Sequence, residues 1–146
     1  MKDKHITIGI LGVGLSSWIV LIWLLVWVFW PYKAIDIAPL KVLNDNKTVT
    51  NGILLYEVDY HKYTDKSCLV SRIIIQNSEN GEKFLIILPS YPSNVMAGKN
   101  KVPIKLLLPA NMPAGDKYVL VITFMYEMNP FRKIEIVSKS EEFSVM

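Results

Sequence analysis

The chain has a single cysteine, Cys68, and only two histidines. One thiol excludes an intrachain disulfide, so packing alone has to hold the fold together, whatever the redox compartment. Metal sites need several His, Cys or carboxylate ligands at one point, and His61 is the only histidine beyond residue 5. We therefore expect no metal and no cofactor. Cys68 itself is expected to be a small buried residue on a strand, with an intermolecular bridge or a reactive thiol as the alternative roles.

Clusters of basic residues and catalytic motifs are also missing. The 16 basic and 13 acidic residues give a net charge of +3 and form no stripe of Lys and Arg, which argues against a nucleic-acid partner. The chain contains no G-x-S-x-G, H-E-x-x-H, P-loop or dinucleotide-binding pattern. We therefore expect no catalytic residues and no enzyme. A hydrolase that uses carboxylates from different strands is the alternative that the sequence leaves open.

Charge is absent from residues 6–30, ITIGILGVGLSSWIVLIWLLVWVFW. A helix of that length reaches roughly 37 Å, against about 30 Å of hydrocarbon in a bilayer. The run is longer than the core of a signal peptide, and no A-x-A-like cleavage site follows it. The sequence therefore predicts a short tail at 1–5, an uncleaved transmembrane signal anchor over 6–31 that ends at Pro31, and one further domain over 32–146.

This predicted anchor carries expectations about localisation and partners. A short tail stays inside more easily than a folded domain, so a single-pass protein with a cytoplasmic N-terminus and an external C-terminal domain is expected, with the lipid bilayer as a partner. Gly9, Gly12 and Ser16 share one helical face. Small residues let helices approach closely, which predicts a helix-packing face and a homo-oligomer through the helix. The alternative is that Gly is simply common in membrane helices.

Helical periodicity is missing from Ile35 onward, where apolar and polar residues alternate between turn signals. The residues 35–43 and 48–50, separated by Asn44-Asp45-Asn46, predict a split edge strand, and Asn51-Gly52 predicts a turn. The runs 68–76 and 83–89 predict a hairpin, and both are almost continuously apolar at their centres. A long strand over 117–128 is expected to pair with 132–145, which bends near 138–140 before Phe143 and Val145 re-enter the core.

About seven short strands at near-regular spacing predict an all-β, immunoglobulin-like antiparallel sandwich. The segment 113–118, PAGDKY, is similar to the entry to the penultimate strand of such folds. There a tyrosine hydroxyl bonds back to the preceding corner, and Tyr118 is the residue predicted to do so. Every tryptophan lies before residue 31, so the antibody-type Cys, Trp, Cys set is absent. A small β-barrel remains the alternative.

The aromatic and charged segment at residues 56–66 is the predicted contact surface, since tyrosine is enriched at interfaces. Its alternative role is to cover the rim of the core with its rings. Asp59, His61 and Asp65 would form a metal site only if the strand end curled, and the spacing favours a solvated face instead. The residues predicted to make the contact are Tyr60, His61, Lys62, Tyr63 and Asp65.

The segments WPYKAIDI, YEVDYHKYTDKSCLVSR, PAGDKYVLVITFMYEMNPFR and EEFSV resemble small uncharacterised single-pass proteins predicted in tailed-phage and prophage genomes. The shared residues are fold and turn residues, so the resemblance implies a phage-encoded, membrane-anchored Ig-like module and assigns no catalytic residue. It also implies the bacterial inner membrane as the location. The expected function is a non-enzymatic interaction or structural module that contacts a protein or envelope partner. A subunit of a larger membrane assembly and the carboxylate hydrolase are the alternatives.

Overall fold

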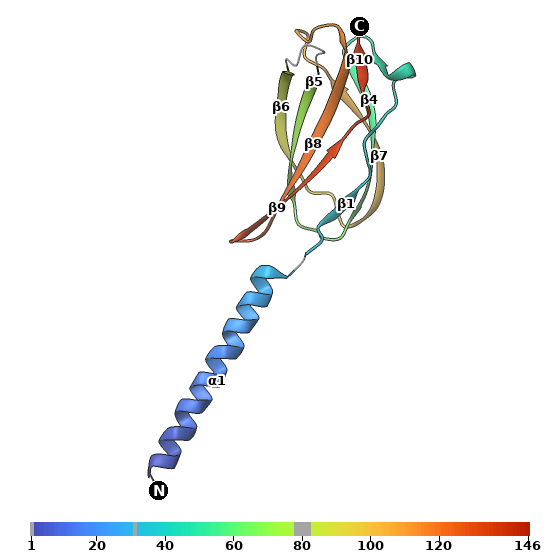
Figure 1. The fold of residues 1–146 in the computed structure, drawn as a ribbon. Coiled ribbons are helices and arrows are strands. Elements are labelled where there is room, and N and C mark those ends of the chain that lie inside the picture. The colour runs from blue at the N-terminus through green and yellow to red at the C-terminus, as the bar shows by residue number, and fades with distance from the viewer. Residues whose placement is uncertain (1, 31, 78–82) are drawn as a thin grey trace. The chain divides into compact units, whose positions relative to one another are not determined.

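The computed structural model describes the backbone of residues 2–30, 32–77 and 83–146, and the side chains of residues 14–30, 32–76 and 84–146. The chain divides into two compact units, residues 1–32 and Lys33–Met146. Helix α1 (Lys2–Phe29) makes up the first unit and begins inside the predicted tail (Figure 1). Its last backbone bond runs from the Trp30 amide to the Val26 carbonyl, at 2.8 Å. Pro31 follows in the sequence, and the residue before a proline avoids helical geometry.

The prediction of a transmembrane helix is corrected by the structure. No helix within the described residues is both long and apolar enough to cross a membrane. The predictions that depended on that span fall with it: the signal anchor, the single-pass localisation, the lipid bilayer as a partner and a homo-oligomer through the helix.

The second unit is a sandwich of two sheets, so the β-rich character of this region is confirmed (Figure 1). In the smaller sheet β4 is central, with β7 on one side and the short strands β1 and β2 on the other. Its strands are β1 (Ile35–Ile37), β2 (Lys41–Val42), β4 (Ile53–Lys62) and β7 (Gly98–Leu107). The part of the predicted split edge strand at 35–43 is thus confirmed as β1 and β2, whereas the part at 48–50 belongs to the larger sheet.

The larger sheet runs in the order β3-β10-β8-β5-β6, with β9 paired to β8 beside β10. Both predicted hairpins, β5 with β6 and β8 with β9, are present. Two contacts depart from the predicted antiparallel sandwich: β10 runs parallel to β3, and an isolated bridge between Leu40 and Ser140 is also parallel. The strands are β3 (Thr48–Val49), β5 (Cys68–Asn77), β6 (Lys83–Ser93), β8 (Gly115–Asn129), β9 (Arg132–Lys139) and β10 (Phe143–Val145).

The described residues therefore form ten strand segments, where about seven were predicted. The difference arises at the short strands, where the chain passes between sheets. A 3₁₀ turn (Asp45–Lys47) precedes β3, and the turn at Asn51 and Gly52, both with positive φ (58° and 68°), leads into β4 of the other sheet. Positive φ at two successive residues is the geometry that Asn-Gly favours.

The core lies between the sheets and is built by alternation, because every second residue of a strand faces inward. In β4 the inward residues are Leu54, Tyr56 and Val58, and in β8 they include Leu120 and Ile122. The bend after β9 returns Phe143 and Val145 to this core, as predicted. The side chains with no exposed surface include Leu40, Val49, Leu54, Tyr56, Ile74, Tyr118, Leu120 and Tyr126.

The predicted hydrogen bond from the Tyr118 hydroxyl back to the preceding corner is confirmed. Tyr118 is fully buried, and its hydroxyl donates to the Pro113 carbonyl at 2.8 Å. Burial raises the pKa of this hydroxyl, since a phenolate would lose its hydration there. The bond ties the loop before β8 to the core of the sandwich.

Tyr118→Phe is expected to lower the free energy of unfolding by about 1 kcal/mol, because the Pro113 carbonyl loses its partner. Urea unfolding monitored by circular dichroism measures the change. The matched control is Tyr63→Phe, which removes an exposed hydroxyl bonded to Asp36 and should change stability by less than about 0.5 kcal/mol. Equal effects in the two variants would show that the corner does not stabilise the fold.

Candidate functional site

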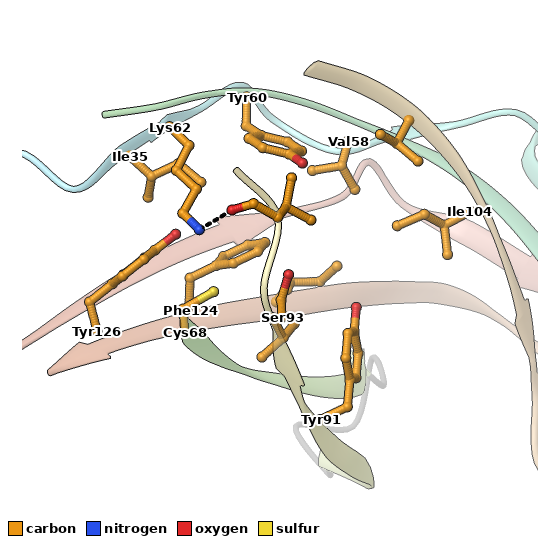
Figure 2. A pocket seen from close by; sticks show the side chains of 14 residues that line it. Ile35, Val58, Tyr60, Lys62, Cys68, Tyr91, Ser93, Ile104, Phe124 and Tyr126 are labelled. Atoms are coloured by element: carbon orange, nitrogen blue, oxygen red, sulfur yellow. Dashed lines mark hydrogen bonds between the residues drawn. The ribbon is translucent and has the colours of Figure 1, made fainter. Parts of the chain in front are cut away.

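A cavity of about 200 Å³ lies between the two sheets, on the side where β6 and β7 form their free edges. Its walls come from both sheets and are mainly apolar (Figure 2). Among the lining residues Tyr91, Val95 and Val102 are exposed, so they mark its mouth. The full lining consists of Ile35, Val58, Tyr60, Lys62, Cys68, Val70, Tyr91, Ser93, Val95, Val102, Ile104, Ile122, Phe124 and Tyr126.

Lys62 is the cation of this cavity. It ends β4 at a position that alternation turns inward, and only 2% of its surface is exposed. Its ammonium donates to the Val95 carbonyl and lies 5.8 Å from the centre of the Tyr126 ring. None of the described lining residues is acidic. A buried charge without a counter-ion is costly, and the contacts of this ammonium within the described residues are the Val95 carbonyl and the Tyr126 ring face.

Tyr126 places a second polar atom in the cavity. Its side chain is fully buried, and its hydroxyl has no hydrogen-bond partner among the described residues. Burial, and then the neighbouring Cys68 thiol, raise the pKa of this hydroxyl, which keeps it a neutral donor. Figure 2 shows the hydroxyl turned toward the Lys62 ammonium. The two polar groups therefore converge at one end of an apolar space.

Cys68 is buried and unpaired, which confirms the role predicted for it. A second pair of buried polar atoms, the Tyr56 hydroxyl and Arg72 Nε, also lacks partners in the described part of the chain. Burial raises the pKa of the Tyr56 hydroxyl above its ordinary value. The Arg72 guanidinium lies 4.8 Å from the centre of the Tyr91 ring, at the margin of the cavity.

The predicted contact residues do not share one surface. Tyr60 and Lys62 face the cavity, whereas His61 and Tyr63 face outward with their rings stacked at 4.4 Å. Asp65 accepts a hydrogen bond from the Ala97 amide at 2.7 Å and so fixes the loop between β6 and β7. Alternation across β4 separates these neighbours, and it was already visible in the sequence.

Two of the residues of the predicted helix-packing face, Gly9 and Gly12, lie outside the described side chains. Ser16 is described and exposed. Within the described residues, no group of three or more His, Cys, Asp or Glu side chains is placed so that it could hold a metal ion.

The carboxylates with lowered pKa values belong to surface ion pairs. Asp36 lies 2.7 Å from Lys33, and Glu127 lies 2.9 Å from Lys133, measured between carboxylate oxygen and ammonium nitrogen. In each pair the hydrogen bond donated by the lysine ammonium is the main cause of the lowered carboxyl pKa. These groups are exposed, and exposed pairs contribute little to stability. Glu127 and Lys133 border an open surface hollow in which Glu127 is the only acidic residue among the described lining residues.

The outer face of the larger sheet carries an apolar patch that the core does not require. Ile73 pairs with Ile87 of β6 and Val121 of β8, which puts three branched side chains in one row across the sheet. A second row joins Ile75 to its neighbours on the same two strands. We call this surface the outer patch; it consists of Ile73, Ile75, Leu85, Ile87, Val119 and Val121.

The most exposed member of the outer patch is Ile87, with 72% of its surface accessible. The near-continuous apolar runs of β5 and β6 were the sequence signal for this surface, because a strand with one solvated face should alternate. Contiguous apolar surface on a folded domain marks contact sites more often than isolated exposed residues do.

Comparison with known proteins gives distant structural likeness alone. No family model matches the chain, and no curated protein matches it. Among solved structures the chain is similar to the alkylpurine DNA glycosylase AlkC of Pseudomonas fluorescens, bound to DNA containing an abasic site analog, with a TM-score of 0.43 and 10% identity. The match covers 80% of this chain and 31% of the glycosylase chain. A likeness this distant assigns no function, and the resemblance to phage and prophage proteins stays a prediction.

Proposed function

We propose that the sandwich of Lys33–Met146 is a non-enzymatic interaction module that binds a protein partner through its outer patch. The observation that supports this proposal is the pair of cross-strand rows centred on Ile73 and Ile75. These side chains face away from the core, so they add nothing to the interior of the sandwich. Their burial by a partner would favour binding by about 25 cal/mol for each Å² of apolar surface removed from water.

The chemistry of the outer patch favours protein over other partners. Its six members are aliphatic, five of them β-branched, and such side chains form a flat, stiff surface. A polyanion would need basic side chains there, and a sugar would need aromatic and polar ones. A protein surface with its own apolar centre is the complementary partner.

No comparable structural feature supports an enzymatic function within the described residues. A carboxylate hydrolase needs acidic side chains close together in a cavity, and the lining of the described cavity contains none. The exposed carboxylates with lowered pKa values are held by lysines instead. The non-enzymatic module is therefore the proposal that we carry forward.

A single charge in the outer patch tests the proposal. Ile87→Lys places an ammonium at its most exposed position, and Ile53→Lys makes the same change on the exposed outer side of β4, in the other sheet. Full-length protein is used to capture partners from an extract of the source cells, and the captured protein is then purified and titrated against each variant. We expect wild type and Ile53→Lys to bind one stoichiometric partner with equal affinity, and Ile87→Lys to bind it at least about tenfold more weakly.

The control measurement is thermal unfolding, which should show that both variants remain folded, since each changes an exposed position. The proposal would be overturned if Ile87→Lys bound the purified partner as tightly as the wild type does. So would the failure of wild-type protein to hold any partner in stoichiometric amount.

A further inference from the structure

We propose that the cavity between the sheets binds a small monocarboxylic acid, with the carboxylate held by Lys62 and Tyr126. The apolar body of this ligand would lie against residues such as Val58, Ile104 and Phe124. This ligand site is separate from the outer patch, and the inference does not depend on the proposed protein partner.

The first argument is charge. An ammonium group has three N–H donors, and the described structure assigns one of those of Lys62, to the Val95 carbonyl. The side chain forms no ion pair with any described acidic group. An anion that enters the cavity would supply the counter-charge and accept the remaining donors. Charge-assisted hydrogen bonds of this kind are the strong ones in proteins.

The second argument is the orphaned hydroxyl. Buried polar groups in folded proteins almost always have partners, and a buried group without one costs stability. The Tyr126 hydroxyl is such a group, and it lies on the same side of the cavity as the Lys62 ammonium (Figure 2). Two donors of different type that point into one space call for an acceptor with two oxygens. A carboxylate fits this requirement and also supplies the negative charge that an alcohol or an amine lacks.

The third argument is size. A protein cavity of about 150 Å³ is known to hold benzene, so about 200 Å³ leaves room for a ring or a short chain with one carboxylate. Four aromatic side chains line the space, which favours a flat or branched apolar body. Benzoate and hexanoate have suitable dimensions.

Access to the cavity is provided by the free edges of the sandwich. β6 is the last strand of the larger sheet and β7 an edge of the smaller one, and the two are not paired to each other. The exposed residues Tyr91 and Val102 stand on these two strands at the mouth of the cavity. A small ligand can therefore enter between these strands without breaking hydrogen bonds between paired strands.

The test titrates benzoate into full-length protein and measures binding by calorimetry and by chemical-shift changes of the cavity residues. Lys62→Met keeps the length of the side chain and removes its charge, so benzoate should bind at least about tenfold more weakly. Lys101→Met is the matched control, because it removes an exposed ammonium paired with Glu57 on the outer side of the smaller sheet. It should bind benzoate as the wild type does. Benzyl alcohol, which has the ring without the charge, should not distinguish the variants.

Tyr126→Phe provides a second test that does not depend on how Lys62→Met folds. The hydroxyl that it removes has no hydrogen-bond partner within the described part of the chain, so the variant should be as stable as wild type or more stable, and should bind benzoate several-fold more weakly. Ile87→Lys should bind benzoate normally, which separates this inference from the proposed function. The inference is overturned if wild type shows no saturable binding of benzoate or hexanoate at millimolar concentration. It is also overturned if Lys62→Met and Tyr126→Phe both bind like wild type, or if the chemical-shift changes lie away from the cavity.

Discussion

Ile74→Ala is expected to lower the free energy of unfolding by about 3 to 4 kcal/mol. Ile74 has no exposed surface and sits in β5, the strand that pairs with both β6 and β8. Truncation removes three carbons from the contact layer between the sheets and leaves a cavity that rigid neighbouring strands cannot fill. Urea unfolding measures the loss, and the slope of the unfolding free energy against urea concentration should stay unchanged.

The matched control for this prediction is Ile87→Ala. Ile87 lies one register row away on β6 with its side chain on the solvent face, so its truncation should change stability by less than about 0.5 kcal/mol. The pair of variants tests the register directly, because a slip of one residue would exchange the two faces. Similar losses in both variants would contradict the sandwich described above.

Phe143→Ala is expected to cost about 3 to 5 kcal/mol, although its strand is only three residues long. The side chain is 2% exposed, and its ring lies 5.9 Å from that of Tyr118, centre to centre. Its loss empties the space between β10 and β8 and weakens the parallel pairing of β10 with β3. The same urea titration measures the effect.

Phe131→Ala serves as the control, because Phe131 is 79% exposed in the turn between β8 and β9. The same deletion there should have little effect on stability. A Phe143→Ala variant as stable as Phe131→Ala would mean that the last strand is not docked in the core.

Several features of the sandwich followed from local rules. Alternation in β4 and β8 identified their inward faces, Asn51-Gly52 marked a turn, and the loop before Tyr118 indicated the hydroxyl bond to Pro113. Each of these depends on neighbours within a few residues, where chain geometry leaves few choices. The predicted transmembrane helix depended on the apolar run of 6–30, and it is the prediction that the structure corrects.

Lys62 shows why the candidate cavity was missed. The sequence predicts Lys62 in a contact surface with its outward neighbour His61, because lysine is seldom buried, yet alternation along β4 turns Lys62 inward. At this position the strand register decides burial, and the residue type does not. The orphaned hydroxyl of Tyr126 had no signal in the sequence, because an absent partner is a property of three-dimensional neighbours.

The sequence by itself determined the elements of the second unit: a disulfide-free chain of short strands, the faces that they bury and the turns that join its hairpins. Only the tertiary structure decided which strands meet across long distances, the parallel pairing of β10 with β3, the cavity around Lys62 and the continuity of the outer patch across β6, β5 and β8. The physical reason is that alternation is a local property of one strand. The partners, cavities and continuous faces depend instead on contacts between residues far apart in the chain.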